Sequence, residues 1–273
     1  MNNNIFDYIT GLVEGDGYIF VPKTKFSDKN IKNYPSIQIS FHLKDLPLCM
    51  KIQEFLGFGS INKKKGVSAY ILTVNSYKGV LYFINILNGR MRTPKMFYLY
   101  NLIDWYPELN IKKLPINLEP IESNSWLAGF VEADGHFSVR TAISGKYHRI
   151  ECRVEIVQRQ NDLLNNNNYD FLKPVADLLL TQVKEIRTDR KHPQYRVRTT
   201  SLLGNENVIN YFNKFPLFGT KYLNYKDWVT VFELFKRKDY NYIEECTNIK
   251  NQMNDYRTLW NWDHLKNFYS LDK

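Results

Sequence analysis

Two acidic residues, each followed by glycine, end the same short sequence at two places in the chain. Residues 9–17 read ITGLVEGDG and residues 127–135 read LAGFVEADG. The final acids, Asp16 and Asp134, are 118 positions apart (134 − 16), close to half of the 273 residues. Paired carboxylates are the oxygen ligands that Mg²⁺ or Ca²⁺ takes. The repeat therefore indicates two copies of one domain that share a divalent-metal site.

Each copy has the pattern of a helix that ends at glycine. Small residues four apart, Gly11 and Gly15 in one copy and Gly129 and Ala133 in the other, would lie on one helix face and let a second helix approach closely. Two such helices would bring the acids together at the negative ends of two helix dipoles, which requires cations. A buried helix with a solvated acidic cap would explain one copy. Two copies with the acid in register favour the metal site.

The repeat resembles the LAGLIDADG motif of homing endonucleases, in the form with two motifs on one chain. The second copy is the closer match, whereas the first departs at Ile9 and Thr10. Both copies have glutamate, Glu14 and Glu132, where the consensus has its first aspartate. The resemblance implies an α+β fold of two pseudo-symmetric αββαββα repeats. These would form a saddle with two antiparallel four-stranded sheets and the motif helices at the central interface.

The pattern between and after the motifs fits two such repeats. Residues 36–43 alternate apolar and polar side chains, as a half-buried strand does. Residues 77–87, 94–106 and 161–180 have helical patterns, the last with an Asn-rich insertion. Three prolines and little periodicity mark residues 107–124 as a linker. We expect an N-terminal repeat over residues 1–106, a linker over residues 107–124, and a C-terminal repeat over residues 125–273 that ends in a helical extension.

The polar faces of the expected strands carry residue types that read base edges, arginine for guanine and glutamine or asparagine for adenine. A two-stranded ribbon is narrow enough to enter the major groove of DNA. An ordinary solvated sheet face would explain any single residue, but the set favours DNA contact. The expected DNA-binding residues are Ser36, Gln38, Ser40, Lys63, Lys65, Thr73 and Asn75 in the first repeat, and Ser138, Arg140, Arg149, Arg153, Arg196 and Arg198 in the second.

The resemblance also implies roles around the two acids. The acids would bind the metal, with help from the backbone carbonyls just before them. A lysine at the start of a late helix in each repeat would stabilise charge on the scissile phosphate. A polar residue near the end of a strand would order water; in the second repeat its register is open, because VQRQND aligns with FHLKD in two ways. The implied residues are Asp16, Asp134, Gly15 and Ala133 for the metal, and Asp16, Asp134, Lys95, Lys221, His42 and Gln158 for catalysis.

The implied activity is that of a site-specific double-strand DNA endonuclease. It would hydrolyse phosphodiesters with Mg²⁺, leave 3′ overhangs and act as a monomer on a long, pseudo-asymmetric double-stranded DNA target, without an obligate protein partner. Ca²⁺ would occupy the site without supporting cleavage. Two alternatives stay open: a group I intron RNA maturase on the same fold, and a non-catalytic DNA-binding module. Because both acids and both lysines are present, cleavage is favoured over the latter.

Composition agrees with an intracellular nucleic-acid partner. The net charge is +9, which favours polyanions. Three widely spaced cysteines leave one unpaired and indicate a reducing compartment. No apolar stretch reaches membrane-spanning length, so we expect no membrane association. The N-terminal residues lack a secretory core and a presequence, and heavy use of Asn, Lys, Ile and Tyr suggests an AT-rich gene. With the resemblance, these features predict an intron-encoded protein of a mitochondrial genome.

Overall fold

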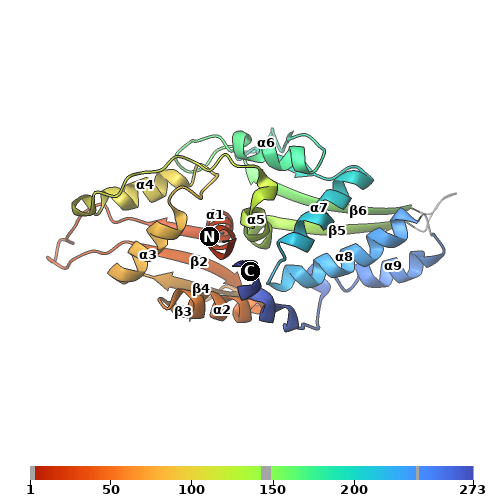
Figure 1. Cartoon of the computed structure of the whole chain (residues 1–273), viewed down its shortest axis with the longest axis horizontal. Helices are drawn as coiled ribbons and strands as arrows, with labels where there is room; N and C mark the ends of the chain where they lie inside the picture. Colours follow the sequence, from red (N-terminus) through yellow and green to blue (C-terminus); the bar gives the residue numbers. More distant parts are fainter. Residues whose placement is uncertain (1–3, 143–148, 238–239, 273) are drawn as a thin grey trace. The chain divides into compact units, whose positions relative to one another are not determined.

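The computed structural model describes residues 4–142, 149–237 and 240–272, which pack as two compact units. The first unit comprises Met1–Glu119, Asn124–Ala133 and Leu271–Lys273, and the second comprises Pro120–Ser123 and Asp134–Ser270. Each contains one four-stranded antiparallel sheet with helices (Figure 1). The predicted α+β class and the order of helix, two strands, helix, two strands and helices are confirmed. No helix in the described ranges is both long and apolar enough to cross a membrane.

The first unit is built around a sheet with the strand order β1-β2-β4-β3. Strand β2 alternates as the sequence predicted, with Ile37, Ile39 and Phe41 buried on the face that forms the core. Ser76 begins α3, because its hydroxyl accepts a hydrogen bond from the Gly79 amide at 3.3 Å. The elements are α1 (Asn4–Asp16), β1 (Gly17–Phe20), β2 (Ser36–His42), α2 (Leu46–Leu56), β3 (Ser60–Lys63), β4 (Ala69–Val74), α3 (Tyr77–Leu87) and α4 (Met96–Asp104).

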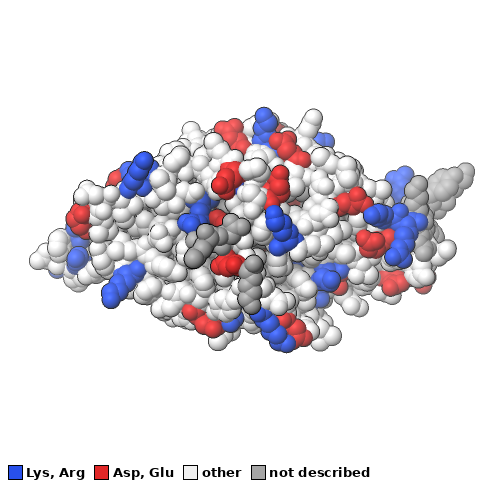
Figure 2. All heavy atoms as spheres, viewed as in Figure 1, with Lys and Arg blue, Asp and Glu red and all other residues white. Residues whose placement is uncertain are grey.

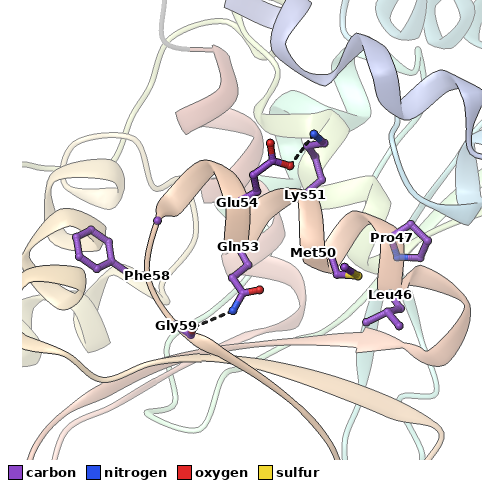
Figure 3. A pocket seen from close by; sticks show the side chains of 9 residues that line it. Leu46, Pro47, Met50, Lys51, Gln53, Glu54, Phe58 and Gly59 are labelled. Carbon is purple, nitrogen blue, oxygen red and sulfur yellow. Dashed lines mark hydrogen bonds and ion pairs between the residues drawn. The ribbon is translucent and has the colours of Figure 1, made fainter.

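Helix α2 borders a shallow hollow on the first unit (Figure 3). The helix ends at Gly57, whose φ of 67° is the left-handed conformation that glycine adopts without strain. The Gln53 side chain then donates to the Gly59 carbonyl at 2.8 Å, and Lys51 pairs with Glu54 at 2.7 Å on the same helix. The bond from Gln53 to Gly59 fixes the turn that leads into β3.

The second unit has the strand order β5-β6-β8-β7 and an aromatic core. Phe137 of β5 packs against Phe212, Tyr225 and Trp228, with ring centroids 5.5–5.9 Å apart. Helix α9 and a 3₁₀ segment, Asp263–Asp272, follow Lys236, where the sequence predicted a helical extension. The elements are α5 (Trp126–Asp134, which starts in the first unit), β5 (Gly135–Ala142), β6 (Arg149–Arg159), α6 (Tyr169–Leu178), β7 (Lys184–Ile186), β8 (Gln194–Arg198), α7 (Leu202–Lys214), α8 (Thr220–Lys236) and α9 (Ile243–Lys250).

The prediction of one helix over residues 161–180 is wrong in its first part. Helix α6 begins only at Tyr169, because the Asn-rich run forms a closed turn. The Asp162 carboxylate accepts from the amides of Leu164 and Asn166, both at 2.8 Å, and the Asn168 side chain donates to the Arg159 carbonyl at 2.9 Å. Asp and Asn side chains that bond to nearby backbone compete with helix formation in this way.

Candidate active site and nucleic-acid interface

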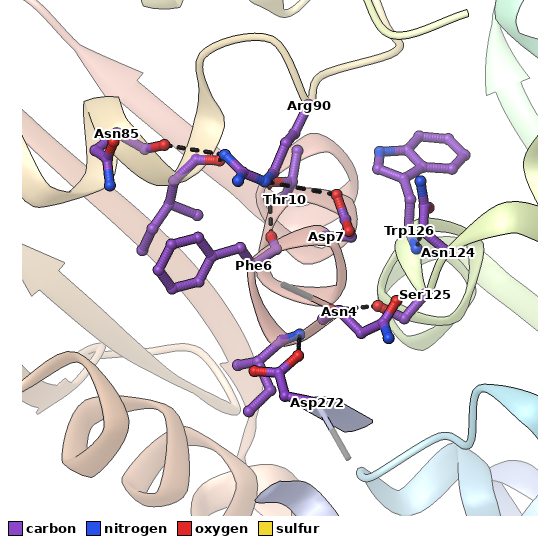
Figure 4. Close-up of polar contacts among 12 residues, drawn as sticks. Asn4, Phe6, Asp7, Thr10, Asn85, Arg90, Asn124, Ser125, Trp126 and Asp272 are labelled. Atoms are coloured by element: carbon purple, nitrogen blue, oxygen red, sulfur yellow. Dashed lines mark hydrogen bonds and ion pairs between the residues drawn. The ribbon is translucent and has the colours of Figure 1, made fainter. Parts of the chain in front are cut away.

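The motif helix α1 and the start of α5 touch through their glycines. A Cβ added to Gly129 would lie 1.9 Å from the Tyr8 carbonyl oxygen, and one added to Gly11 would lie 2.1 Å from the Trp126 carbonyl oxygen. Only glycine allows two helix backbones to approach so closely. The Ser125 hydroxyl also donates to the Asn4 carbonyl (Figure 4). The small residues at four-residue spacing therefore do what the sequence predicted for them at Gly11 and Gly129.

Each motif helix also donates a side-chain hydrogen bond to the motif glutamate of the other. The Trp126 Nε1 donates to Glu14 at 2.5 Å, and the Tyr8 hydroxyl donates to Glu132 at 3.1 Å. These four positions correspond under the 118-residue offset of the repeat, because Tyr8 matches Trp126 and Glu14 matches Glu132. The bonds are reciprocal and fix the rotation of each helix about its axis.

Glu14, on the first motif helix, is 4% exposed and takes part in several hydrogen bonds. Besides Trp126, its carboxyl group accepts from the amides of Arg92 at 3.0 Å and Thr93 at 2.6 Å, and bonds to the Thr93 hydroxyl at 2.6 Å. Burial raises the pKa of Glu14, and these hydrogen bonds oppose that rise. Glu14 therefore fixes the position of the backbone at Arg92 and Thr93, just before Lys95.

The N-terminal end of α1 is held by charged side chains from distant parts of the chain (Figure 4). The Asp272 side chain accepts from the Ile5 amide at 3.1 Å, which satisfies one free amide of the first helical turn. Arg90 lies 3.7 Å from Asp7 and donates to the carbonyls of Asn85 and Ile86. Burial raises the pKa of Asp7 to about 6, against the attraction of the nearby guanidinium groups.

At the C-terminal end of α1, Lys95 reaches the backbone just around Asp16. Its ammonium group donates to the carbonyls of Val13 at 3.0 Å, Gly15 at 3.2 Å and Gly17 at 2.9 Å. A cation at this end of a helix complements the helix dipole. Asp16 is exposed at the last position of the helix. The structure therefore brings three of the predicted site residues together, with the Gly15 carbonyl already bonded to the lysine.

In the second unit, Gln158 is the direct partner of the motif acid. Its side-chain amide donates to Asp134 at 2.8 Å, and Asp134 is half-buried. Strand register settles which residue of the first unit corresponds to Gln158. Gly17 pairs with Ile39 and Gly135 pairs with Ile156, so Gln158, two residues beyond Ile156, matches the buried Phe41.

His42, the residue predicted as its counterpart, matches Arg159 instead. His42 is exposed at the end of β2, where its Nδ1 accepts from the Lys44 amide at 3.2 Å. Gln158 shares a side of β6 with the buried Ile156, so it lies on the core side of its sheet. The two units therefore differ at the polar position beside the motif acid.

Lys221, the predicted partner of Lys95, is the second residue of α8 and is half-buried. Burial lowers the pKa of His136 at the start of β5, and the positive charge of Lys221 lowers it further, while Glu155 opposes both effects. Lys221 is therefore close enough to β5 for its positive charge to affect the pKa of His136. The Ala133 carbonyl stays a predicted metal ligand.

The residues around each motif acid fit a hard divalent cation. The donors are carboxylate and backbone carbonyl oxygens, the set that Mg²⁺ and Ca²⁺ take. Across the described ranges, no cluster of three or more His, Cys, Asp or Glu side chains could hold a metal by itself. A cation at Asp16 or Asp134 would therefore need other ligands as well. Water, backbone carbonyl and phosphate oxygens can provide them.

The solvent-facing side of the first sheet, termed the first outer face, carries no Asp, Glu, Lys or Arg within its four strands. Its members are identified by cross-strand pairing, such as Tyr18 with Gln38 and Gln38 with Thr73. Ser36 departs from expectation, since it is 6% exposed and its hydroxyl accepts from Gln38 at 3.4 Å. The face consists of Tyr18, Phe20, Ser36, Gln38, Ser40, His42, Ser60, Asn62, Ala69, Ile71 and Thr73. Of the other predicted contacts, Lys63 pairs with Tyr70 on the opposite side of the sheet, whereas Lys65 and Asn75 lie outside the strands; all three are exposed.

The second outer face is highly charged. Arg153 pairs with Glu151 at 2.5 Å, and Glu155 lies 3.8 Å from both Arg196 and Arg198. The face consists of His136, Ser138, Arg140, Ala142, Arg149, Glu151, Arg153, Glu155, Val157, Arg159, Lys184, Ile186, Gln194, Arg196 and Arg198. All predicted contacts of the second repeat lie on it. Figure 2 shows basic side chains mixed with acidic ones on the side of the molecule in view.

Sequence reasoning missed several residues of these faces. Tyr18 and Phe20 are exposed by 50% and 40% on β1, and simple alternation along residues 18–20 would have found them. Glu151 and Glu155 have the same alternation as the predicted arginines of β6. A basic hollow beside the β7–β8 turn combines residues of one short segment with Arg159, which the fold brings to them; the others are Arg187, Arg190, Lys191, His192 and Gln194.

Comparison with known proteins agrees with this architecture. The sequence model of the LAGLIDADG endonuclease matches residues 9–106 and again residues 127–232. The intron-encoded DNA endonuclease aI3 of Saccharomyces cerevisiae is 30% identical over 97% of this chain and 73% of its own length. The intron-encoded RNA maturase bI4 of the same organism is 32% identical over 51% of this chain and 20% of its own length.

Among solved structures, the LAGLIDADG homing endonuclease I-GzeII in complex with its DNA target superposes with a TM-score of 0.68. It is 22% identical, and the match covers 94% of this chain and 100% of that one. Two motifs on paired helices and two matching sheets define a double-motif endonuclease fold. The chain belongs to the LAGLIDADG endonuclease family, as its two motifs predicted.

Proposed function

We propose that this chain is a site-specific endonuclease that hydrolyses both strands of a long double-stranded DNA target. The observation that carries the proposal is that each motif acid ends a motif helix and has polar support beside it. Lys95 bonds to three carbonyls around Asp16, and Gln158 donates to Asp134. The DNA endonuclease named among its relatives and the DNA target of the structural neighbour support the same assignment.

Asp16 and Asp134 would hold divalent cations, with the carbonyls of Gly15 and Ala133 as further oxygen ligands. When bound, Mg²⁺ supplies an activated water and neutralises charge on the phosphate and on the leaving oxygen. Gln158 orients the Asp134 carboxylate through its amide. Cleavage of both strands would leave 3′ overhangs, and Ca²⁺ would occupy the sites without supporting cleavage.

The lysines act beside the acids. Lys95 keeps its ammonium group at the end of α1, where it can stabilise the negative charge that develops on a scissile phosphate. Lys221 would do the same in the second unit, and His42 would order water near the end of β2. Both outer faces would contact base edges, with Lys63 and Lys65 on the phosphate backbone.

The test begins with a cleavage selection on a randomised DNA library in Mg²⁺, which supplies a target. Asp16→Asn and Asp134→Asn should then abolish double-strand cleavage and leave DNA binding largely intact. Asp7→Asn, on the same helix as Asp16 but at its other end, is the matched control and should keep cleavage. Wild-type cleavage by either of the first two variants would remove these acids from the mechanism.

A maturase activity is a second candidate, because the RNA maturase bI4 matches half of this chain. A group I intron splicing assay with the cleavage-deficient Asp134→Asn variant separates the two activities. Retained splicing would show that one chain carries both.

We further propose that the protein acts as a monomer and is encoded by an intron of a mitochondrial genome. Two motifs on one chain supply both acids. A chain with one motif would have to form a dimer to obtain the same pair. Light scattering of the DNA complex tests this, since an obligate dimer would contradict it. The intron-encoded relatives support the mitochondrial origin, as does the heavy use of Asn, Lys, Ile and Tyr, which suggests an AT-rich gene.

A further inference from the structure

The two outer faces differ so much in chemistry that they cannot suit the same bases. Within its four strands, the first outer face has amide, hydroxyl, imidazole, aromatic and aliphatic groups and no Asp, Glu, Lys or Arg. The second carries six arginines, a lysine and two glutamates on equivalent strands.

We propose that the two halves of the DNA target differ in base composition. The half read by the first outer face is rich in A·T pairs, and the half read by the second outer face is rich in G·C pairs. This inference rests on the proposed function and deepens it, because it names the kind of sequence that each half of the protein recognises.

The amides of the first outer face are set up for adenine. Gln38 donates one N–H to the Ser36 hydroxyl at 3.4 Å, and Asn62 donates one N–H to the Ser60 hydroxyl at 3.3 Å. A side-chain amide has two N–H donors and a carbonyl. Each residue therefore keeps an N–H and an oxygen, which is the pair that adenine N7 and N6 require in the major groove.

The apolar members of the same face fit the thymine methyl group. Phe20 and Tyr18 are 40% and 50% exposed beside Ser36 and Gln38 on the neighbouring strand. Ile71 and Thr73 add an aliphatic side chain and a methyl group on β4. Apolar contacts of this kind discriminate thymine, the one base with a major-groove methyl. Adenine and thymine recognition thus come from adjacent residues.

The second outer face has the donors for guanine and the acceptors for cytosine. Arginine bonds bidentately to guanine O6 and N7, and a carboxylate accepts from cytosine N4. Arg196 and Arg198 lie 3.8 Å from Glu155, which is within ion-pair range but longer than a hydrogen bond. The glutamate therefore orients both guanidinium groups without using up their donors. Arg140 and Arg149 are exposed at the other end of the face.

The test is the cleavage selection with the sequences of both half-sites read separately. Arg198→Gln should change the preferred bases only in the G·C-rich half, with a loss of roughly 5- to 150-fold at one position. Gln38→Leu should do so only in the A·T-rich half. Arg190→Gln, in the turn outside the face, is the control and should weaken all sequences alike.

A chemical substitution checks the thymine contact. Replacing thymine by uracil removes only the methyl group, and should weaken wild-type binding to the A·T-rich half by roughly 4-fold for each methyl that is buried. In the Phe20→Ser variant, replacing the thymine that Phe20 contacts by uracil should no longer weaken binding. The same replacement in the other half should have little effect.

Three results would overturn the inference. Equal base composition in the two half-sites would refute the asymmetry while leaving the endonuclease assignment intact. Uniform weakening by Arg198→Gln would show that the arginine contacts phosphate. No sequence-selective cleavage by the wild-type protein would refute the proposed function itself and this inference with it.

Discussion

Replacing Gly129 by alanine tests the close approach of α1 and α5 quantitatively. The added Cβ would lie 1.9 Å from the Tyr8 carbonyl oxygen, whereas real Cβ atoms essentially never come within 3.0 Å of another atom. The backbones must therefore separate by about 1.1 Å (3.0 − 1.9). The atom in the way is backbone, so no side-chain rotation can relieve the overlap.

The cost follows from what that separation breaks. Overpacking of this kind costs about 1–3 kcal/mol. An opening of 1.1 Å along the bond from Tyr8 to Glu132, now 3.1 Å, would also break it, and a lost hydrogen bond to a charged group costs about 1.5–3 kcal/mol. Alanine stabilises a helix by up to about 1 kcal/mol relative to glycine, which offsets part of this cost. We therefore expect Gly129→Ala to lower the free energy of unfolding by about 1.5–6 kcal/mol, the range these terms span.

Urea denaturation followed by circular dichroism measures this loss. Gly79→Ala is the matched control within a helix of the same unit, since its Cβ would meet only side-chain atoms, 2.6–3.1 Å away. It should cost clearly less. A loss below about 1 kcal/mol for Gly129→Ala would mean that the helices accept a side chain at their contact, and the packing argument would be refuted.

Three further changes probe the residues around the acids and the first helix. Lys95→Met should reduce cleavage by roughly 100-fold or more with little change in DNA binding, and Lys95→Arg should recover part of it; unchanged cleavage of a plasmid target would exclude the lysine from catalysis. Gln158→Leu removes the donor to Asp134 and should make nicked plasmid accumulate before linear product, whereas parallel loss of both cuts would contradict a role confined to one acid. Asp7→Asn should stabilise the protein by up to about 3 kcal/mol at pH 8 and little at pH 4, because the raised folded pKa of about 6 makes wild-type stability fall as pH rises from about 4 to 6; equal effects of the substitution on unfolding at both pH values would refute this.

Local patterns were sufficient to predict most of the elements. The alternation from Ser36 to His42 and the helical pattern from Tyr77 to Leu87 predicted β2 and α3 with little error. The doubled motif predicted both glycine-lined helices. These elements are determined by residues that are close in the sequence, so they can be predicted from one amino-acid sequence.

The rest depends on contacts between distant residues. Glu14 bonds to the backbone at Arg92 and Thr93, 78 and 79 positions away, and no local pattern encodes that pairing. The match of Gln158 with Phe41 could be found only from strand register. The Asn-rich run was misassigned because a side-chain turn at Asp162 outcompeted the helix.

The reciprocal bonds between α1 and α5 have a consequence for recombining halves of related proteins. A hybrid that joined this first repeat to a foreign second one at the linker would import a foreign α5. Tyr8 would then need an acceptor in place of Glu132, and Glu14 would need a donor in place of Trp126. A junction after Ala133 keeps both bonds native. The compatibility of two halves can therefore be judged from these few positions before any hybrid is made.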